Sequence, residues 1–167
     1  MILLGIETSC DETSVAVIEY HKKSISLKSN VMASSLSLHA KTGGIIPEIA
    51  ARKQIEYMQP VLTQALTESF EGENLYESLG RIDAIAVTYG PGLIGSLLVG
   101  VETAKTLAYV LNKPIIPINH MVGHIYANWI EHPQIAFPAI ALVISGGHTD
   151  MLLMKEHGKM HLLGGTR

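Results

Sequence analysis

Residues 81–120 read RIDAIAVTYGPGLIGSLLVGVETAKTLAYVLNKPIIPINH, and this stretch decides the fold. An apolar run, DAIAVT (83–88), leads into a glycine-rich turn, and a long helical pattern follows to about Leu111. A second apolar run, PIIPIN (114–119), begins shortly after the helical pattern ends. Strand, helix and strand in this order predict a βαβ unit, so part of the sheet is parallel and a helix covers it.

Three runs near the amino terminus predict the antiparallel part of the same sheet. ILLGIETS (2–9) and TSVAVIEY (13–20) are separated by only a few residues, which is typical of a hairpin. A third run, SISLKSNVMASS (24–35), can complete a meander. The predicted sheet is therefore mixed, with antiparallel strands first and the βαβ unit after them.

Residues 47–69 predict a helix that covers this sheet. Six apolar residues recur near the helical period, and Pro47 stands where a first turn tolerates proline. Pro60 is expected to kink or break the helix, because proline removes a backbone donor and clashes with the preceding turn. The six apolar residues are Ile49, Ile55, Met58, Leu62, Ala65 and Leu66.

After the βαβ unit the chain begins a different pattern. HMVGHIYANWIEH (120–132) predicts a further helix, and three strand-like runs follow: AIALVIS (139–145), DMLLMKE (150–156) and MHLLGG (160–165). These last strands have no following helix to cover them. They therefore look like the start of a second domain.

Composition limits the protein class. At 167 residues, with 47% hydrophobic and 16% charged residues, the chain has room for one well-buried domain and is too apolar for disorder. The net charge of −3 does not indicate a nucleic-acid binder, so any RNA contact is local or needs help. A single cysteine, Cys10, and the lack of a signal-like or membrane-spanning segment favour a cytoplasmic protein without membrane association.

Three polar or glycine-rich turns are candidate ligand sites. ETSCDETS (7–14) is either a polar hairpin turn or a cradle for an anion or a metal-bound anion. YGPGLIGSLLVG (89–100) is either a tight strand-to-helix turn or a backbone site at a helix amino terminus. SGGHT (145–149) fits a two-residue hairpin turn without any ligand.

His120 and His124 are four residues apart, which places both on one face of a helix. They are either one core and one surface histidine or half of a metal site just beyond a parallel strand, where open α/β sheets bind ligands. A zinc protease is excluded, because Met121 stands where that motif needs glutamate. A metal site would still need a third ligand.

Taken together, the motifs resemble one family, TsaD, the tRNA N6-adenosine threonylcarbamoyltransferases once called O-sialoglycoprotein endopeptidases. The resemblance covers essentially all 167 residues but only the amino-terminal part of the family's usual length. It rests on five motifs: GIETSCDETSVAV (5–17), GGIIPEIAARKQ (43–54), GPGLIGSLLVG (90–100), HMVGH (120–124) and VISGGHT (143–149).

The resemblance implies an α/β fold of the actin-like, sugar-kinase-like (ASKHA) class. The first lobe, with its mixed sheet and covering helices, would span residues 1–132, and residues 133–167 would begin a second, truncated lobe. The implied activity is transfer of threonylcarbamoyl from threonylcarbamoyl-adenylate to N6 of the adenosine 3′ of the anticodon, in tRNAs that read codons beginning with A. The implied partners are tRNA and the proteins TsaB and TsaE.

The resemblance also implies the site residues. His120 and His124 match metal ligands for one divalent ion per subunit, with iron favoured over zinc, and Asp11 matches an acidic residue needed for activity as a base or a positioning group. The family's third ligand, an aspartate, is expected beyond residue 167. The substrate-binding loop would comprise Val143, Ile144, Ser145, Gly146 and Gly147.

Valine at position 143, where archaeal and eukaryotic relatives carry a tyrosine ligand, places the chain with the bacterial members. A chain of this length is expected to bind metal weakly and to be inactive alone. Two other functions stay open: a non-catalytic interaction module that binds TsaB, and an actin-like phosphotransferase.

Overall fold

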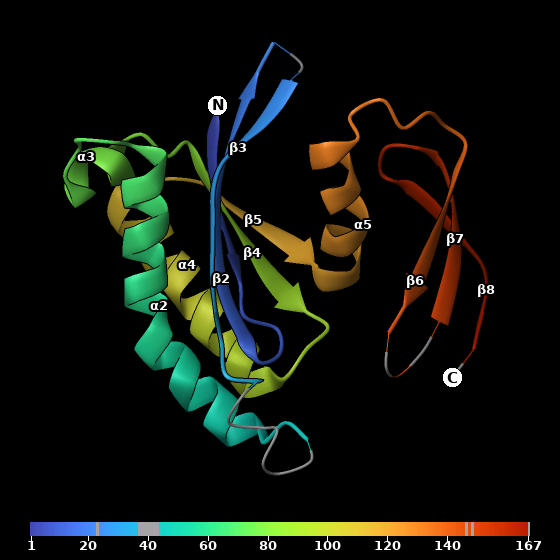
Figure 1. Cartoon of the computed structure of the whole chain (residues 1–167), viewed down its shortest axis with the longest axis horizontal. Helices are drawn as coiled ribbons and strands as arrows, with labels where there is room; N and C mark the ends of the chain where they lie inside the picture. The colour runs from blue at the N-terminus through green and yellow to red at the C-terminus, as the bar shows by residue number, and fades with distance from the viewer. Residues whose placement is uncertain (23, 37–43, 146, 148, 167) are drawn as a thin grey trace. The chain divides into compact units, whose positions relative to one another are not determined.

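The computed structural model describes residues 1–22, 24–36, 44–145, 147 and 149–166 (Figure 1). The chain divides into two compact units, Met1–His120 and Met121–Arg167. The lobe boundary expected after residue 132 stays a prediction.

The first unit is built on a five-stranded mixed sheet in the order β3-β2-β1-β4-β5. β1 pairs antiparallel with β2, β2 pairs antiparallel with β3, and β4 and β5 run parallel to β1. The predicted hairpin, meander and βαβ unit are therefore confirmed. The strands are β1 (Ile2–Glu7), β2 (Glu12–His21), β3 (Ser24–Ser34), β4 (Ala84–Gly90) and β5 (Ile115–Asn119).

The core lies between this sheet and two helices on one of its faces, α2 (Pro47–Ser69) and α4 (Ile94–Leu111) (Figure 1). Alternate residues of β1 and β2 point into it, as the two-residue period of a half-buried strand requires. Burial of these side chains is the main force that holds α2 and α4 on the sheet. The largest fully buried apolar side chains of this core are Leu4, Val15, Val17, Leu66, Ile82 and Ile85.

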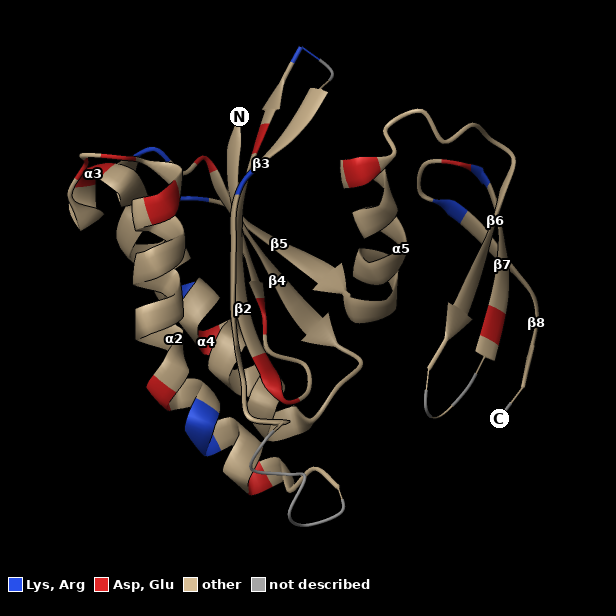
Figure 2. Cartoon of the chain, in the orientation of Figure 1, with Lys and Arg blue, Asp and Glu red and all other residues tan. Residues whose placement is uncertain are grey.

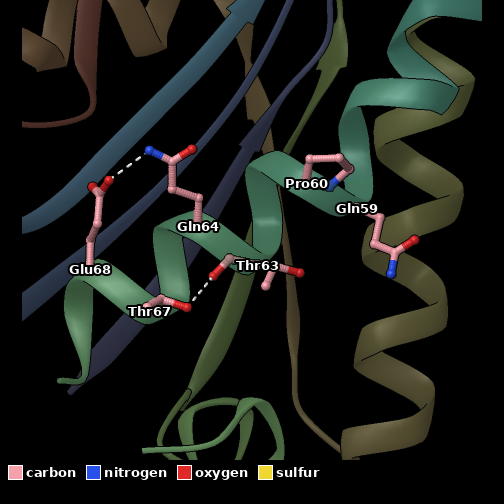
Figure 3. A pocket seen from close by; sticks show the side chains of 6 residues that line it. All are labelled: Gln59, Pro60, Thr63, Gln64, Thr67 and Glu68. Atoms are coloured by element: carbon pink, nitrogen blue, oxygen red, sulfur yellow. Dashed lines mark hydrogen bonds between the residues drawn. The ribbon is translucent and has the colours of Figure 1, made fainter. Parts of the chain in front are cut away.

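The structure bears on two expectations for α2. Of the two outcomes expected at Pro60, the break does not occur, because proline removes only one backbone donor from a helix of 23 residues that the core holds, and the kink stays a prediction (Figure 3). Its buried stripe includes Gln54 and Met58, whereas Ile49 and Ile55 are exposed. A shallow hollow of about 670 Å³ on the outer side is lined by α2 residues alone, among them Thr63 and Glu68 (Figure 3).

A short helix, α3 (Leu75–Gly80), was not expected from the hydrophobic pattern. Its amino terminus carries a capping box, in which the Asn74 side chain accepts from backbone amides of Tyr76 and Glu77. The Glu77 carboxylate in turn accepts from the Asn74 amide. This reciprocal capping satisfies amides that a helix start leaves without partners.

α4 ends at Leu111, as the sequence predicted, and Asn112 follows it in the left-handed region at φ 53°. By length and composition, α4 could also cross a membrane, a test that core helices of soluble proteins also pass. Its buried residues, Leu97 and Ala104 among them, lie on the side that packs on β4 and α2. Other apolar side chains of α4, such as Ile94 and Leu98, are exposed.

The second unit contains most of α5 (His120–Glu131) and a three-stranded antiparallel sheet in the order β6-β7-β8. The predicted strands are confirmed as β6 (Ala139–Ile144), β7 (Thr149–Glu156) and β8 (Lys159–Thr166). An aromatic cluster of Tyr126, Trp129, Phe137 and His157 joins α5 to the β7–β8 turn. Its closest ring pair, Phe137 and His157, has centroids 4.7 Å apart.

Candidate functional site

One side chain of α2, Gln54, holds the turn between β1 and β2 in place. The amide nitrogen of Gln54, which is fully buried, lies 3.3 Å from the carbonyl oxygen of Thr8 and 3.0 Å from those of Cys10 and Glu12. An amide group is well suited to this place, because its NH₂ has two N–H donors to share among the three carbonyls. Gln54 therefore fixes the backbone on both sides of Asp11.

One residue of this turn, Thr8, hydrogen-bonds to the backbone of α4. Thr8 Oγ1 donates to the carbonyl oxygen of Ser96 at 2.8 Å and accepts from the amide of Gly100 at 3.1 Å. Those two backbone groups are four residues apart and would ordinarily bond to each other within the helix. A Cβ at position 100 would lie 2.4 Å from the Thr8 hydroxyl, so glycine is needed for this close approach.

Gly92 is explained in the same way. A Cβ there would lie 2.5 Å from the carbonyl oxygen of Ser9, and that oxygen accepts from the amide of Leu93 at 2.7 Å. A backbone amide at the start of α4 is thus used by the protein's own chain. The tight-turn interpretation of the glycine-rich stretch accounts for Gly92 and Gly100 without a ligand.

Glu7, at the end of β1, is the centre of a polar cluster at the carboxyl edge of the parallel strands. Its carboxylate accepts from the Ser9 amide through Oε1 and from the Thr88 hydroxyl through Oε2, and Oε2 lies 3.2 Å from Nδ1 of His120. Burial raises the pKa of the Glu7 carboxyl, but the hydrogen bonds from Ser9, Thr88 and His120 outweigh it and hold that pKa below its ordinary value. Glu7 is therefore a carboxylate that accepts on both oxygens.

His120 and His124 are the first residue of α5 and the residue one turn later, as the sequence predicted. The His120 side chain is 25% exposed, and His124 is an exposed residue. Partial burial of one and exposure of the other also fit a core and a surface histidine. Within the described ranges, no group of three or more His, Cys, Asp or Glu side chains is arranged to hold a metal, so the pair has no third ligand there.

Asp11 lies at the outer end of the β1–β2 turn. Its carbonyl oxygen accepts from the amide of Ser35 at 3.1 Å and from the Ser35 hydroxyl at 2.9 Å, which ties the turn to the end of β3. Desolvation raises the pKa of the neighbouring Cys10 thiol, and the Asp11 carboxylate adds to the rise through a hydrogen bond and its charge. The structure therefore holds the Asp11 backbone in place, and the role of its carboxylate stays a prediction.

The predicted substrate-binding loop belongs to the second unit. Val143 and Ile144 are the last two residues of β6, and Ile144 is 72% exposed. Ser145 and Gly147 follow the strand, while Gly146 lies outside the described residues, as does His148. The described residues of the loop thus lie at the end of β6 and just after it, and the role of the loop stays a prediction.

Residues 26–167 match the sequence profile of the family described as "TsaD: tRNA N6-adenosine threonylcarbamoyltransferase". The chain belongs to the TsaD family. The tRNA N6-adenosine threonylcarbamoyltransferase of Thermomicrobium roseum is 49% identical over 172 residues, which is 99% of this chain and 45% of that protein. The chain therefore spans a little under half the length of this TsaD relative.

Solved structures confirm the fold class. YeaZ from Pseudomonas aeruginosa has a TM-score of 0.59 at 20% identity, covering 98% of this chain and 66% of that one. A PPX-GPPA enzyme from Aquifex aeolicus has a TM-score of 0.54 at 12% identity, and the match covers 99% of this chain and 51% of that one. At these identities the likeness concerns the fold alone, and it places this TsaD chain in the actin-like α/β class.

Two residues of this TsaD chain were not assigned a role from the sequence, although a signal exists for each. Glu7 ends a strand that runs parallel to β4 and β5, and side chains at the carboxyl edge of parallel strands meet. Gln54 is a polar residue spaced four from Ala50 and four from Met58, within a buried helical stripe. A polar side chain in such a stripe indicates a buried hydrogen-bonding role.

Proposed function

We propose that the chain takes part in threonylcarbamoyl transfer from threonylcarbamoyl-adenylate to N6 of the adenosine 3′ of the anticodon, in tRNAs that read codons beginning with A. The observation that carries this proposal is the 49% identity to a named threonylcarbamoyltransferase over 99% of the chain. The reaction joins a nucleophilic amine to a carbamoyl carbon with AMP as leaving group. It needs no protein nucleophile, so Cys10 has no required role.

We further propose that His120 and His124 hold one divalent metal ion, iron in preference to zinc. The donor set fits, because imidazole suits iron and zinc and a carboxylate partner on the other ring nitrogen is the usual support of a metal-binding histidine. Glu7 is in that position relative to His120. A bound ion would supply Lewis-acid polarisation of the carbamoyl carbonyl.

In this proposal the other site residues bind and orient the reactants. Asp11 either accepts a proton from the attacking amine or positions it, and Gln54 and Ser35 hold the backbone around it. The amides of Gly146 and Gly147 and the hydroxyl of Ser145 would bind the anionic end of threonylcarbamoyl-adenylate. Val143 and Ile144 would hold that loop at the end of β6.

Catalysis is proposed to need more than these 167 residues. The chain spans 45% of the Thermomicrobium roseum relative, and no third His, Cys, Asp or Glu among its described residues completes a metal group with the proposed ligands His120 and His124. In the family the third ligand is an aspartate farther along the sequence. We therefore infer that the 167-residue chain by itself binds metal weakly and transfers no measurable threonylcarbamoyl.

The partners proposed are tRNA, TsaB and TsaE, in the cytoplasm. Lys and Arg are spread over separate elements and acidic residues lie at the β1–β2 turn, so tRNA binding is proposed to need help from partner proteins (Figure 2). An apolar groove of about 600 Å³ between α2 and α4 supports docking of TsaB. Its lining includes Ile55, 67% exposed, and Leu98, 52% exposed.

A second candidate function is a non-catalytic interaction module, which the same α2–α4 groove favours. A chimera distinguishes an interaction module from a part of the catalytic site. Residues 1–167 of this chain would replace the matching part of the Thermomicrobium roseum protein, and modified adenosine in tRNA would be measured by mass spectrometry of nucleosides. TsaB, TsaE and threonylcarbamoyl-adenylate would be supplied.

The catalytic proposal expects the chimera to modify tRNA, His120→Ala to abolish the modification, and His161→Ala, an exposed residue of β8, to leave it unchanged. A folded chimera whose activity does not depend on His120 would overturn it. A chimera that binds TsaB without modifying tRNA would favour the interaction module. Robust transfer by the 167-residue chain alone would refute the inference that it supplies only half of the site.

A further inference from the structure

Three adjacent parallel strands bring Glu7, Thr88 and His120 together. Glu7 ends β1, Thr88 lies near the end of β4, and His120 follows directly after β5. β4 pairs with both β1 and β5 in parallel, so their carboxyl ends meet at one edge of the sheet. The cluster is therefore positioned by three paired strands of the first unit, with a register shift between Thr88 and Gly90 where β4 pairs with β5.

The Glu7 carboxylate is surrounded by donors. The Ser9 amide donates to Oε1, the Thr88 hydroxyl donates to Oε2, and Nδ1 of His120 lies 3.2 Å from Oε2. Thr88 is 5% exposed, and the Glu7 and His120 side chains are 35% and 25% exposed. Two oxygens that both accept hydrogen bonds require a carboxylate, because the glutamine amide would present a donor at one of them.

This arrangement selects one tautomer of His120. An unprotonated Nδ1 would direct its lone pair at the Glu7 carboxylate, which is repulsive, whereas a protonated Nδ1 donates to it. Ser9 Oγ, 3.1 Å from the same nitrogen, can accept from that proton as well. A neutral imidazole with its proton on Nδ1 carries its lone pair on Nε2.

We propose that Glu7 is a positioning residue that fixes His120 as a metal ligand through Nε2, by holding the proton on Nδ1 and the ring in one orientation. The inference rests on the proposed metal-binding function of His120. A carboxylate partner of this kind also raises the basicity of the ligating nitrogen, and its loss costs roughly 10–100-fold in metal affinity. Thr88 supports Glu7 by fixing the oxygen that faces His120.

The test uses the purified 167-residue chain with Glu7→Gln, Thr88→Val and a matched control, Glu12→Gln. Glu12 is an exposed carboxylate of the same turn. Long-range ¹H–¹⁵N spectra of the metal-free protein report which nitrogen of His120 carries the proton. The His120→Ala variant lacks the His120 signals and so identifies them. Titration with Zn²⁺ against a chelator gives the affinity, and circular dichroism confirms that each variant is folded.

The inference expects a pyrrole-like Nδ1 in the wild type and in Glu12→Gln, and a mixture of tautomers in Glu7→Gln. It expects Zn²⁺ affinity to fall roughly 10–100-fold in Glu7→Gln and by less in Thr88→Val. An unchanged tautomer and affinity in folded Glu7→Gln would overturn it. If His120→Ala binds Zn²⁺ as the wild type does, the proposed metal function fails instead. Should Glu7→Gln not fold, the tautomer of His120 in the Thr88→Val variant decides the test.

Discussion

The hydroxyl of Thr8 lies 3.1 Å from the amide nitrogen of Gly100 and replaces a backbone carbonyl as the acceptor for that amide inside α4. The same hydroxyl donates to Ser96, so one side chain from the β1–β2 turn completes the hydrogen bonding of a helix 88 residues away in sequence. The turn and the helix are therefore fixed to each other by a buried polar contact, which is costly to disturb.

Gly100→Ala is expected to lower the free energy of unfolding by about 1–3 kcal/mol, because the new Cβ would lie 2.4 Å from Thr8 Oγ1. Gly80→Ala is the matched control, since a Cβ there meets nothing within 4 Å in another helix. Alanine should stabilise that site slightly through its helix propensity. Urea denaturation followed by circular dichroism measures both.

A double-mutant cycle with Thr8→Ala separates the clash from a general effect on α4. Removing the hydroxyl takes away the atom nearest to the new Cβ, so the two changes should be non-additive by about 0.5–3 kcal/mol. Strict additivity would contradict the contact between Thr8 and Gly100.

Gln54→Leu is expected to destabilise the chain by about 2–4 kcal/mol, because the carbonyls of Thr8, Cys10 and Glu12 lose their donor. Gln64→Leu provides the control, since Gln64 is an exposed residue of the same helix. That change should stay within about 0.5 kcal/mol. Equal midpoints of urea unfolding for the two variants would be inconsistent with the role given to Gln54.

Cys10 is expected to react slowly with iodoacetamide at pH 8, because desolvation and the Asp11 carboxylate raise its pKa and so reduce the thiolate fraction. Asp11→Asn removes the negative charge, so the pKa should fall and the rate at pH 8 should rise. Glu19→Gln, on β2 and paired with Lys28, is the control and should leave the rate unchanged. A rate–pH profile that does not move in Asp11→Asn would show that Asp11 does not act on the thiol.

Ile55→Glu is expected to abolish binding of TsaB while changing the free energy of unfolding by less than about 0.5 kcal/mol, since this side chain is 67% exposed in the α2–α4 groove. Tyr76→Ser, at an 87% exposed position of α3, should leave binding intact. Size-exclusion chromatography of the mixed proteins measures the complex. Persistence of the complex in Ile55→Glu would place the docking surface elsewhere.

The sheet and its helices could be predicted because residues typical of helix ends and turns mark their limits. Proline at 47 and asparagine at 112 stand at a helix start and a helix end, and the runs between them have clear periods. α3 was missed because six residues give no readable period, although the spacing of Asn74 and Glu77 was a capping signal. Ile55 is exposed because it lines the groove between α2 and α4 rather than the core.

The candidate site could be predicted only in part, because its supporting contacts join residues far apart in sequence. Gln54 binds carbonyls more than 40 residues away, and Glu7 meets Nδ1 of His120 across 113 residues. Side-chain spacing cannot reveal an acceptor that is a backbone carbonyl. It does reveal a pair on one helix, and for that reason His120 and His124 were found and Glu7 was not assigned a role.

Metal stoichiometry tests the central claim most directly, namely that His120 and His124 form half of a metal site. The purified chain would be titrated with Fe²⁺ under anaerobic conditions and, separately, with Zn²⁺, and the bound ion counted by elemental analysis. We expect one weakly bound ion per chain, lost in His120→Ala and in His124→Ala and kept in His161→Ala. Binding that survives in both His120→Ala and His124→Ala, or no binding by the wild-type chain, would contradict the claim.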